Sequence, residues 1–179
     1  QLKNIRESVS IPLILMGYLN PVYQFGIEKF CTKCAETGID GTILPDLPLD
    51  EYESEFKPVF EKYKLHNILL ITPQTSENRI RQIDKASTGF IYMVSSSSTT
   101  GAGKKVEDFQ KDYFERIKNM NLKNPRLIGF GISDNATFNN ACRYAHGAIV
   151  GSAFVKSFKS DVNIDNSVFQ FVKNILGNE

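Results

Sequence analysis

Two glycine-containing stretches near the C-terminal end have the residue types and spacing of an anion site. Leu127-Ile128-Gly129-Phe130-Gly131-Ile132-Ser133 is typical of a buried strand that ends in glycine and leads into a helix, with Ser133 as the expected N-cap. Gly147-Ala148-Ile149-Val150-Gly151-Ser152-Ala153 repeats the pattern, with a Gly-Ser pair directly before the next helix. Backbone N–H groups at a helix N-terminus lack an intrahelical acceptor, and the helix dipole favours negative charge there. The tandem turns therefore predict a phosphate site, and the alternative is that these glycines only make tight turns.

Cysteine and histidine give no comparable signal. Cys31 and Cys34 form a C-x-x-C, but no second pair follows, so two small core residues one turn apart on a helix over 27–37 are favoured over a redox or zinc site. His66 and His146 each precede a predicted strand. In (β/α)8 barrels the N-terminal ends of the strands contribute to stability and the C-terminal ends carry the active site, so neither histidine is expected to be catalytic. We predict no metal site.

An acid and a base for catalysis would stand at the ends of the predicted strands. The polar side chains there are Tyr18, Asp46, Thr72, Tyr92 and Ser95. Asp46 is the only carboxylate, so spacing alone nominates it as a base, although a turn role in Pro-Asp-x-Pro fits equally well. The apolar and aromatic residues near strand ends fit either a flat apolar part of a ligand or ordinary barrel filling; they are Tyr18, Tyr92, Phe130 and Ile149.

Strands and helices alternate in the predicted pattern, which indicates βαβ units with a parallel sheet. The expected strands lie at 12–17, 41–44, 67–71, 89–94, from Arg126, and at 148–150. Residues 18–21 are expected to form a loop. The expected helices are 27–37, about 50–63 with Pro58 as the point where it could break, one after Ser76, 109–119, one from Ser133, one after Gly151, and 166–176. The serine-rich stretch 95–105 is better placed to be a mobile lid than a plain linker.

Six β/α units in 179 residues fall short of the eight units and about 250 residues of a closed (β/α)8 barrel. No linker suggests a second domain, so residues 1–179 are predicted to be a single barrel domain. The sequence opens with Gln1 inside what looks like the tail of a helix, which suggests a piece of a longer chain. If it were the whole polypeptide, we would expect an open or dimerised barrel.

The composition of the chain narrows the classes of partner and the cellular location that can be expected. The net charge of +1 gives no electrostatic reason to expect nucleic acid or an anionic membrane as a partner. The longest apolar run, 11–16, is too short to cross a bilayer. Three cysteines and no signal-peptide pattern favour the cytoplasm.

Five motifs in order resemble those of tryptophan synthase alpha subunits and together cover nearly all of the chain. They are residues 15–26 (LMGYLNPVYQFG), 41–48 (GTILPDLP), 92–102 (YMVS leading to TTGA), 129–133 (GFGIS) and 147–153 (GAIVGSA). The resemblance implies a lyase of tryptophan biosynthesis. Such an enzyme cleaves indole-3-glycerol phosphate to indole and glyceraldehyde 3-phosphate by a retro-aldol reaction with general acid–base catalysis, without metal or cofactor.

The resemblance also implies roles for individual residues. The two catalytic carboxylates of the family, a Glu and an Asp, precede Gln1, so the chain would lack the first two β/α units, contain no catalytic residue and be inactive alone. The implied substrate-binding residues are Tyr18, Tyr92, Thr100, Gly101, Phe130, Gly131, Ile132, Gly151 and Ser152. The implied contacts with a beta subunit, in an alpha2-beta2 heterotetramer, are Asn20, Pro21, Tyr23, Asp46 and Pro48. This replaces the catalytic interpretation of Asp46.

Two alternatives stay open. One is another phosphate-binding barrel enzyme, such as a phosphoribosyl isomerase or a thiamine phosphate synthase, against which the Pro-Asp-x-Pro and Tyr-Leu-Asn-Pro motifs argue. The other is a phosphate-binding fragment without catalysis that regulates a partner subunit.

Overall fold

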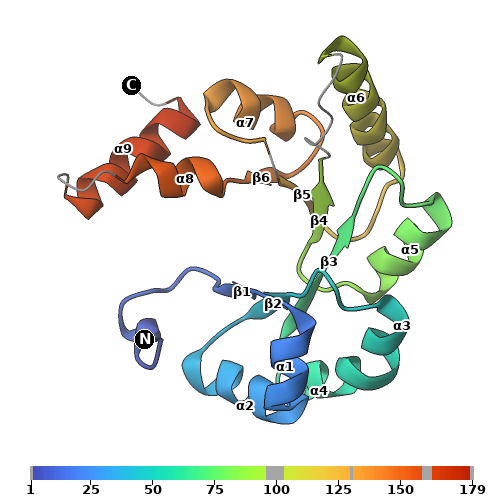
Figure 1. Ribbon diagram of the computed structural model, residues 1–179, viewed down its shortest axis with the longest axis vertical. Coiled ribbons are helices and arrows are strands. Elements are labelled where there is room, and N and C mark those ends of the chain that lie inside the picture. The colour runs from blue at the N-terminus through green and yellow to red at the C-terminus, as the bar shows by residue number, and fades with distance from the viewer. Residues whose placement is uncertain (1, 96–102, 130, 159–162, 178–179) are drawn as a thin grey trace. The chain divides into compact units, whose positions relative to one another are not determined.

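The structure is a computed structural model that describes residues 2–95, 103–129, 131–158 and 163–177, in which strands and helices alternate along the chain (Figure 1). The strands in these ranges are β1 (Ile14–Met16), β2 (Gly41–Ile43), β3 (His66–Ile71), β4 (Ile91–Val94), β5 (Arg126–Gly129) and β6 (Gly147–Ile149). The helical elements are η1 (Ile5–Glu7), α1 (Leu19–Phe25), α2 (Ile27–Thr37), α3 (Leu49–Glu51), η2 (Tyr52–Phe56), α4 (Lys57–Lys62), α5 (Glu77–Ala86), α6 (Gly103–Asn119), α7 (Asn135–Cys142), α8 (Ser152–Ser157) and α9 (Ile164–Leu176).

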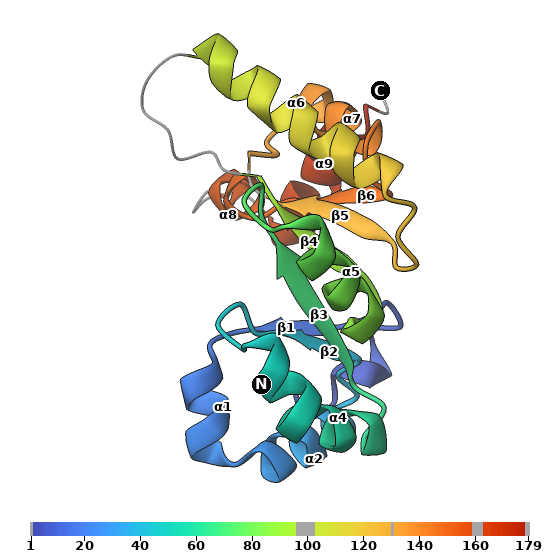
Figure 2. The ribbon, with the colours of Figure 1, turned by 90° about the vertical axis from the view of Figure 1, so that its right-hand side faces the viewer.

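The chain divides into two compact units, one of residues 1–70 and 77–91 and one of residues 71–76 and 92–179. In the first unit, β1, β2 and β3 pair in parallel and in sequence order, with Ile14 opposite Gly41 and Gly41 opposite His66. Helices α1, α2 and α4 lie together on one side of these strands (Figures 1 and 2). The strands are short apolar runs, as expected for a parallel sheet that is covered by helices.

Aromatic and aliphatic side chains fill the core of the first unit. Phe60 is fully buried, and its ring meets Tyr52 and Phe56 edge to face at centroid distances of 5.9 and 6.1 Å. Cys31 and Cys34 are also buried, and burial raises their pKa values to about 12 and 11. Such thiols stay protonated at neutral pH, so the C-x-x-C contributes packing to α2, in agreement with the core interpretation.

One local expectation for this unit was wrong. Residues 18–21 were expected to form a loop, but α1 begins at Leu19. Its N-terminus is capped from a distant loop, because the Asp46 carboxylate accepts the N–H of Leu19 at 2.8 Å. Pro21 stands in the first turn, where a missing N–H costs no helical hydrogen bond.

The helix expected over about 50–63 is present over 49–62 as three consecutive segments, of which the middle one, η2, is π-helical. Pro58 does not break it, since it stands in the first turn of α4. The wider π turn directs both Tyr52 and Phe56 into the core.

Sequence reasoning did not find the role of Arg6, which attaches the N-terminal segment to the first unit. Its guanidinium donates to the Gly38 and Ile11 carbonyls, both at 2.7 Å, and to the Asp40 carboxylate. Asp40 also accepts the N–H of Leu13 at 2.7 Å. These bonds fix the chain on its approach to β1.

In the second unit, β5 and β6 pair in parallel, and the N–H of Ser95 after β4 donates to the Gly129 carbonyl of β5. Helices α6 and α7 lie on the same side of β5 and β6 (Figures 1 and 2). Helix α6 begins earlier than the expected residue 109. The Tyr113 hydroxyl donates to the Ile71 carbonyl at 3.2 Å, and Arg116 donates to the Pro73 carbonyl at 2.9 Å. These bonds tie residues 71–76 to the second unit.

Candidate phosphate-binding site

The turn after β5 requires glycine. Gly131 has a φ of +76°, which an L side chain rarely adopts, and no heavy atom lies within 4 Å of the position of a Cβ there. Within the described ranges, the N–H groups of Gly131 and Ile132 have no acceptor. The backbone is therefore open for a ligand at this turn.

The expected N-cap of the following helix was wrong by one residue. Asp134, not Ser133, caps α7, and its carboxylate accepts the N–H of Thr137 at 2.8 Å. The Thr137 hydroxyl accepts the N–H of both Ser133 and Asp134 at 3.1 Å, which completes a capping box. The N–H and the hydroxyl of Thr137 both donate to the Asp134 carboxylate, and these two hydrogen bonds hold its pKa below the usual value. Since α7 brings its own carboxylate to its N-terminus, the donors left for an anion are those of the preceding turn.

The turn after β6 has the same position relative to its strand. Because Gly129 is opposite Ile149 in the parallel register, Gly131 and Gly151 each stand two residues beyond a matched pair at the same edge. Gly151 is the N-cap of α8, and no heavy atom lies within 4 Å of the position of a Cβ there. The N–H groups of Gly151 and Ser152 have no acceptor in the part of the chain that the structure describes. The parallel register thus puts four of the predicted residues, Gly131, Ile132, Gly151 and Ser152, just beyond the ends of two paired strands.

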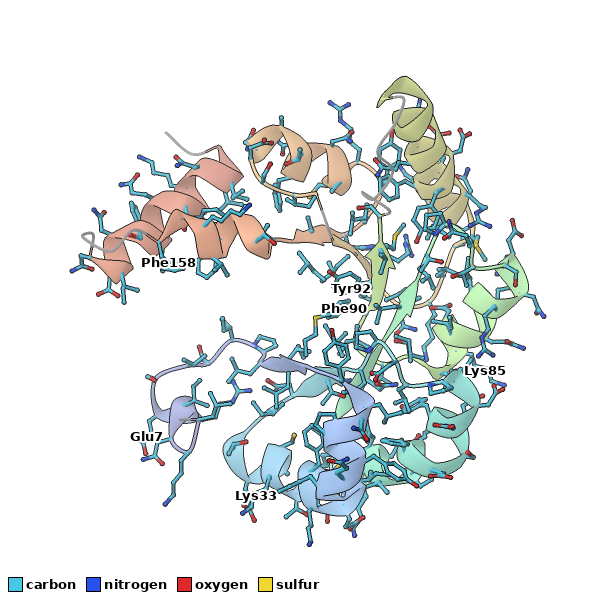
Figure 3. The ribbon with its side chains drawn as sticks, viewed as in Figure 1. Glu7, Lys33, Lys85, Phe90, Tyr92 and Phe158 are labelled. Atoms are coloured by element: carbon cyan, nitrogen blue, oxygen red, sulfur yellow. The ribbon has the colours of Figure 1, made fainter. Side chains whose placement is uncertain are left out.

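Tyr92 lies against the strand that leads to the first turn. Its side chain extends from β4 (Figure 3) and is 5% exposed, and burial raises the pKa of its hydroxyl. A Cβ on Gly129 would lie 2.0 Å from the Tyr92 hydroxyl oxygen, so the ring occupies the space that a larger residue would need. Gly129 is therefore glycine because Tyr92 packs on its backbone.

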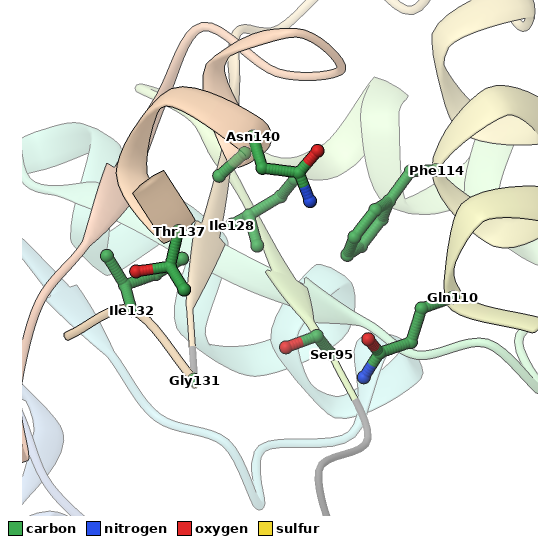
Figure 4. Close-up of a pocket in the computed structure, with 9 residues that line it drawn as sticks. Ser95, Gln110, Phe114, Ile128, Gly131, Ile132, Thr137 and Asn140 are labelled. Carbon is green, nitrogen blue, oxygen red and sulfur yellow. The ribbon is translucent and has the colours of Figure 1, made fainter. Parts of the chain in front are cut away.

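A pocket of about 130 Å³ adjoins the first turn (Figure 4). Gly131 and Ile132 line it together with side chains from β5, α6 and α7 and with Ser95, which follows β4. The carboxamides of Gln110 and Asn140 and the ring of Phe114 border the same space. The Ser95 hydroxyl donates to the Gly129 carbonyl at 3.0 Å. Sequence reasoning considered Ser95 but missed Gln110 and Asn140, for which the sequence carries no local signal.

Three of the predicted substrate-binding residues, Thr100, Gly101 and Phe130, lie outside the described residues, as does most of the expected lid. Tyr18 belongs to the first unit, where it is 71% exposed as the N-cap of α1.

The residues expected at a partner interface lie on the first unit. Asn20, Tyr23 and Asp46 line one hollow, which Leu19, Glu51 and Glu55 complete. Pro21 and Pro48 are exposed, in α1 and at the N-cap of α3. Asp46 is exposed and caps α1, a structural role that does not require it to act as a base.

The two histidines lie where the sequence placed them, His66 at the first residue of β3 and His146 just before β6. The Nδ1 atom of His146 accepts the N–H of Arg126 at 3.3 Å. Across the described ranges, no three side chains of His, Cys, Asp or Glu are grouped to hold a metal ion, and no helix is long and apolar enough to cross a membrane.

Consecutive β/α units with a parallel sheet define the class of protein as an α/β barrel of the TIM type. Comparison with known proteins gives the family. Residues 1–177 match the profile of the tryptophan synthase alpha chain, and the chain belongs to that family.

Curated relatives and solved structures agree. The tryptophan synthase alpha chain of Flavobacterium johnsoniae is 64% identical over 156 residues, which are 87% of this chain and 62% of that protein. The alpha chain of Flavobacterium psychrophilum is 57% identical over 98% of this chain and 69% of that protein. The Pyrococcus furiosus tryptophan synthase α2β2 complex contains a chain that matches 98% of this one at 31% identity with a TM-score of 0.83, over 71% of its own length.

The chain therefore corresponds to only part of the family's fold. The chain spans 62% of the length of the Flavobacterium johnsoniae relative and 56% of a matching structure from Aquifex aeolicus. Its six strands with their helices correspond to about six of the eight β/α units of a TIM barrel, as the sequence predicted.

Proposed function

We propose that this chain takes part in the cleavage of indole-3-glycerol phosphate to indole and glyceraldehyde 3-phosphate. The observation that carries the proposal is the family match over residues 1–177, combined with the two open glycine turns at neighbouring strand ends. In this proposal the free N–H groups of Gly131, Ile132, Gly151 and Ser152, with the Ser152 hydroxyl, hold the phosphate of the substrate. The resemblance gives substrate-binding roles also to Tyr92, Phe130, Tyr18, Thr100 and Gly101, with Tyr92 next to the indole ring.

The chemical step needs groups beyond the phosphate site. The resemblance puts the family's catalytic Glu and Asp before Gln1, so we expect these 179 residues alone to bind a phosphate ligand without releasing indole. The described residues then serve as the half of the enzyme that binds and orients the substrate. We propose assembly with a tryptophan synthase beta chain, because a relative of known structure forms an α2β2 complex. We also propose a cytoplasmic location, which the small number of cysteines favours.

The phosphate part is tested by Gly151→Asp in the whole protein that carries this sequence. Two negative charges about 4 Å apart repel by about 4 kcal/mol at an effective dielectric constant of 20. Affinity for a phosphate ester of an indolyl alcohol, measured by calorimetry, should therefore fall by roughly 1,000-fold. Asn174→Asp is the matched control, because it adds the same charge on an exposed position of α9, and its affinity should stay unchanged.

Unchanged affinity in Gly151→Asp would show that the phosphate binds elsewhere. Indole release from indole-3-glycerol phosphate, measured with and without the beta chain, tests the activity itself. A whole protein that binds the phosphate ester but releases no indole would favour the alternative of a regulatory phosphate-binding module.

A further inference from the structure

The hydroxyl of Thr137 connects the first turn of α7 to the glycine turn before it. It accepts the N–H groups of Ser133 and Asp134, both at 3.1 Å, and donates to the Asp134 carboxylate at 2.8 Å. Ser133 directly follows Gly131 and Ile132, whose N–H groups have no acceptor in the described ranges. Backbone donors that are open to a ligand are thus followed at once by backbone donors that a side chain already occupies.

Gly131 depends on its neighbours for a fixed conformation. It is exposed, and no heavy atom lies within 4 Å of the position of a Cβ there, so packing at this residue does not fix the direction of its N–H. Glycine also has the widest choice of backbone conformations. The residues after it supply the restraint, because Ile132 is only 9% exposed and Ser133 is bonded to Thr137. Thr137 and Ile132 line the same pocket (Figure 4), so both act on the turn from its C-terminal side.

The same hydroxyl belongs to the capping box that closes the N-terminus of α7. The Asp134 carboxylate accepts the N–H of Thr137 at 2.8 Å, and the N–H of Phe138 donates to the Asp134 carbonyl at 3.0 Å. A carboxylate at a helix N-terminus interacts favourably with the helix dipole and takes the place that an external anion would otherwise have. An anion at this strand end is therefore left with the donors of the glycine turn, and the Thr137 hydroxyl restrains their direction.

We propose that Thr137 is a positioning residue of the phosphate site. Its hydroxyl holds the N–H of Ser133, and this bond keeps the N–H groups of Gly131 and Ile132 in the direction that the phosphate needs. The proposal rests on the proposed function, because it takes these two N–H groups as phosphate donors. Neither the spacing of the motifs nor the family resemblance assigned a role to Thr137.

The test compares Thr137→Val with Thr137→Ser in the whole protein that carries this sequence. Valine has nearly the shape of threonine but no hydroxyl, whereas serine keeps the hydroxyl. Asn163→Ala is the matched control, because Asn163 caps α9 through the N–H groups of Asp165 and Asn166 and belongs to neither glycine turn. Calorimetry measures the affinity for a phosphate ester of an indolyl alcohol, and the same alcohol without its phosphate is the control ligand. Urea unfolding measures the stability of each variant.

Thr137→Val should bind the phosphate ester roughly 10-fold more weakly, as expected when one hydrogen bond to a charged group is misaligned. Its affinity for the alcohol should stay within about twofold of wild type, since the alcohol has no phosphate for the glycine turn to hold. Thr137→Ser should restore the affinity for the ester. Asn163→Ala should lose stability as Thr137→Val does, because each change removes a capping acceptor, but its affinity for the ester should stay unchanged.

The outcomes separate the two proposals. The inference is overturned if Thr137→Val binds the ester as tightly as wild type, if it loses affinity for the ester and the alcohol equally, or if Asn163→Ala weakens ester binding as much. In each of these cases the wild type still binds the ester, and the proposed phosphate site stands. If the wild type does not bind the ester, or if Gly151→Asp leaves its affinity unchanged, the proposed phosphate site itself is wrong and Thr137 has nothing to position.

Discussion

Gly129→Ala should destabilise the second unit, because the space for a side chain at that position is already occupied. The three heavy atoms nearest to an added Cβ all belong to Tyr92, at 2.0, 2.3 and 2.5 Å. Both residues are buried, so the ring cannot move aside into solvent. Forcing extra atoms into a packed core typically costs about 1–3 kcal/mol, and at contacts this short we expect the upper part of that range.

The assay is urea unfolding followed by circular dichroism, with thermal unfolding as a second measure. A domain of this size should lose about 2–4 °C in Tm for each kcal/mol. Gly17→Ala is the matched control, because no heavy atom lies within 4 Å of an added Cβ there, and its stability should change by less than about 0.5 kcal/mol. In the whole protein that carries this sequence, Gly129→Ala should also weaken the binding of a phosphate ester of an indolyl alcohol, since Tyr92 is the proposed neighbour of the indole ring.

Second-site changes identify the clash. In a Tyr92→Leu background, which removes all three close atoms, Gly129→Ala should cost less than about 0.5 kcal/mol, a coupling of the size that contacting residues show. Tyr92→Phe removes only the hydroxyl oxygen and leaves the ring carbons at 2.3 and 2.5 Å, so it should rescue little. The reasoning is refuted if Gly129→Ala is as mild as Gly17→Ala, or if its cost is the same with and without the Tyr92 ring.

Two further predictions concern Arg6 in the first unit and the three cysteines of the chain. Arg6→Met should lower stability at pH 7, because it removes the hydrogen bonds of the Arg6 guanidinium to two carbonyls and to Asp40. The loss should be only about 1–2 kcal/mol, since part of this hydrogen bonding is to solvent-accessible groups. The N–H of Leu13 and the guanidinium of Arg6 hold the pKa of Asp40 below its usual value, so this carboxylate's contribution is present above its unfolded pKa of about 3.9 and is lost as the pH falls through the lower folded value. The cost of Arg6→Met, from urea titrations at a series of pH values, should therefore shrink in acid, and a cost independent of pH would contradict the Asp40 pairing. Among the thiols, Cys142 is exposed, whereas Cys31 and Cys34 are buried and have raised pKa values. One thiol should therefore react with a disulfide reagent at pH 8, and the other two should react only on unfolding. Fast reaction of all three thiols in the native protein would contradict the core role of the two cysteines of α2.

Elements that have a start or stop residue such as glycine at both ends were predictable from the sequence. Helix α2 spans the predicted residues 27–37, because Gly26 and Gly38 bound it and Gly38 adopts the left-handed conformation that ends helices. The apolar runs located the strands, although β1 is shorter than the expected 12–17. Pro12 lacks an N–H, which excludes it from most ladder positions.

Elements that depend on distant partners were not predictable in the same way. Asn20-Pro21 read locally as a turn, and what makes it a helix is the carboxylate of Asp46, 27 residues away from the N–H that it caps. Ser133 has the right type for an N-cap, but Asp134 beside it makes the stronger charged hydrogen bond and moves the start of α7 by one residue. The hydrogen bonds from Arg6 to Gly38 and Asp40 also join residues more than 30 positions apart.

The same division explains which half of the candidate site the sequence revealed. A phosphate held by backbone N–H groups needs glycine at turns of fixed register, and such a need is written locally, as at Gly131 and Gly151. The pocket beside the first turn is lined by Gln110 and Asn140, which come from two helices that no spacing rule connects. The hollow beside α1 is likewise lined by Asn20 and Tyr23 together with Glu51 and Glu55 from a later part of the sequence. Because folding alone brings these side chains together, they are the positions at which substitutions can change what the protein recognises without disturbing the glycine turns that we propose as the anion site.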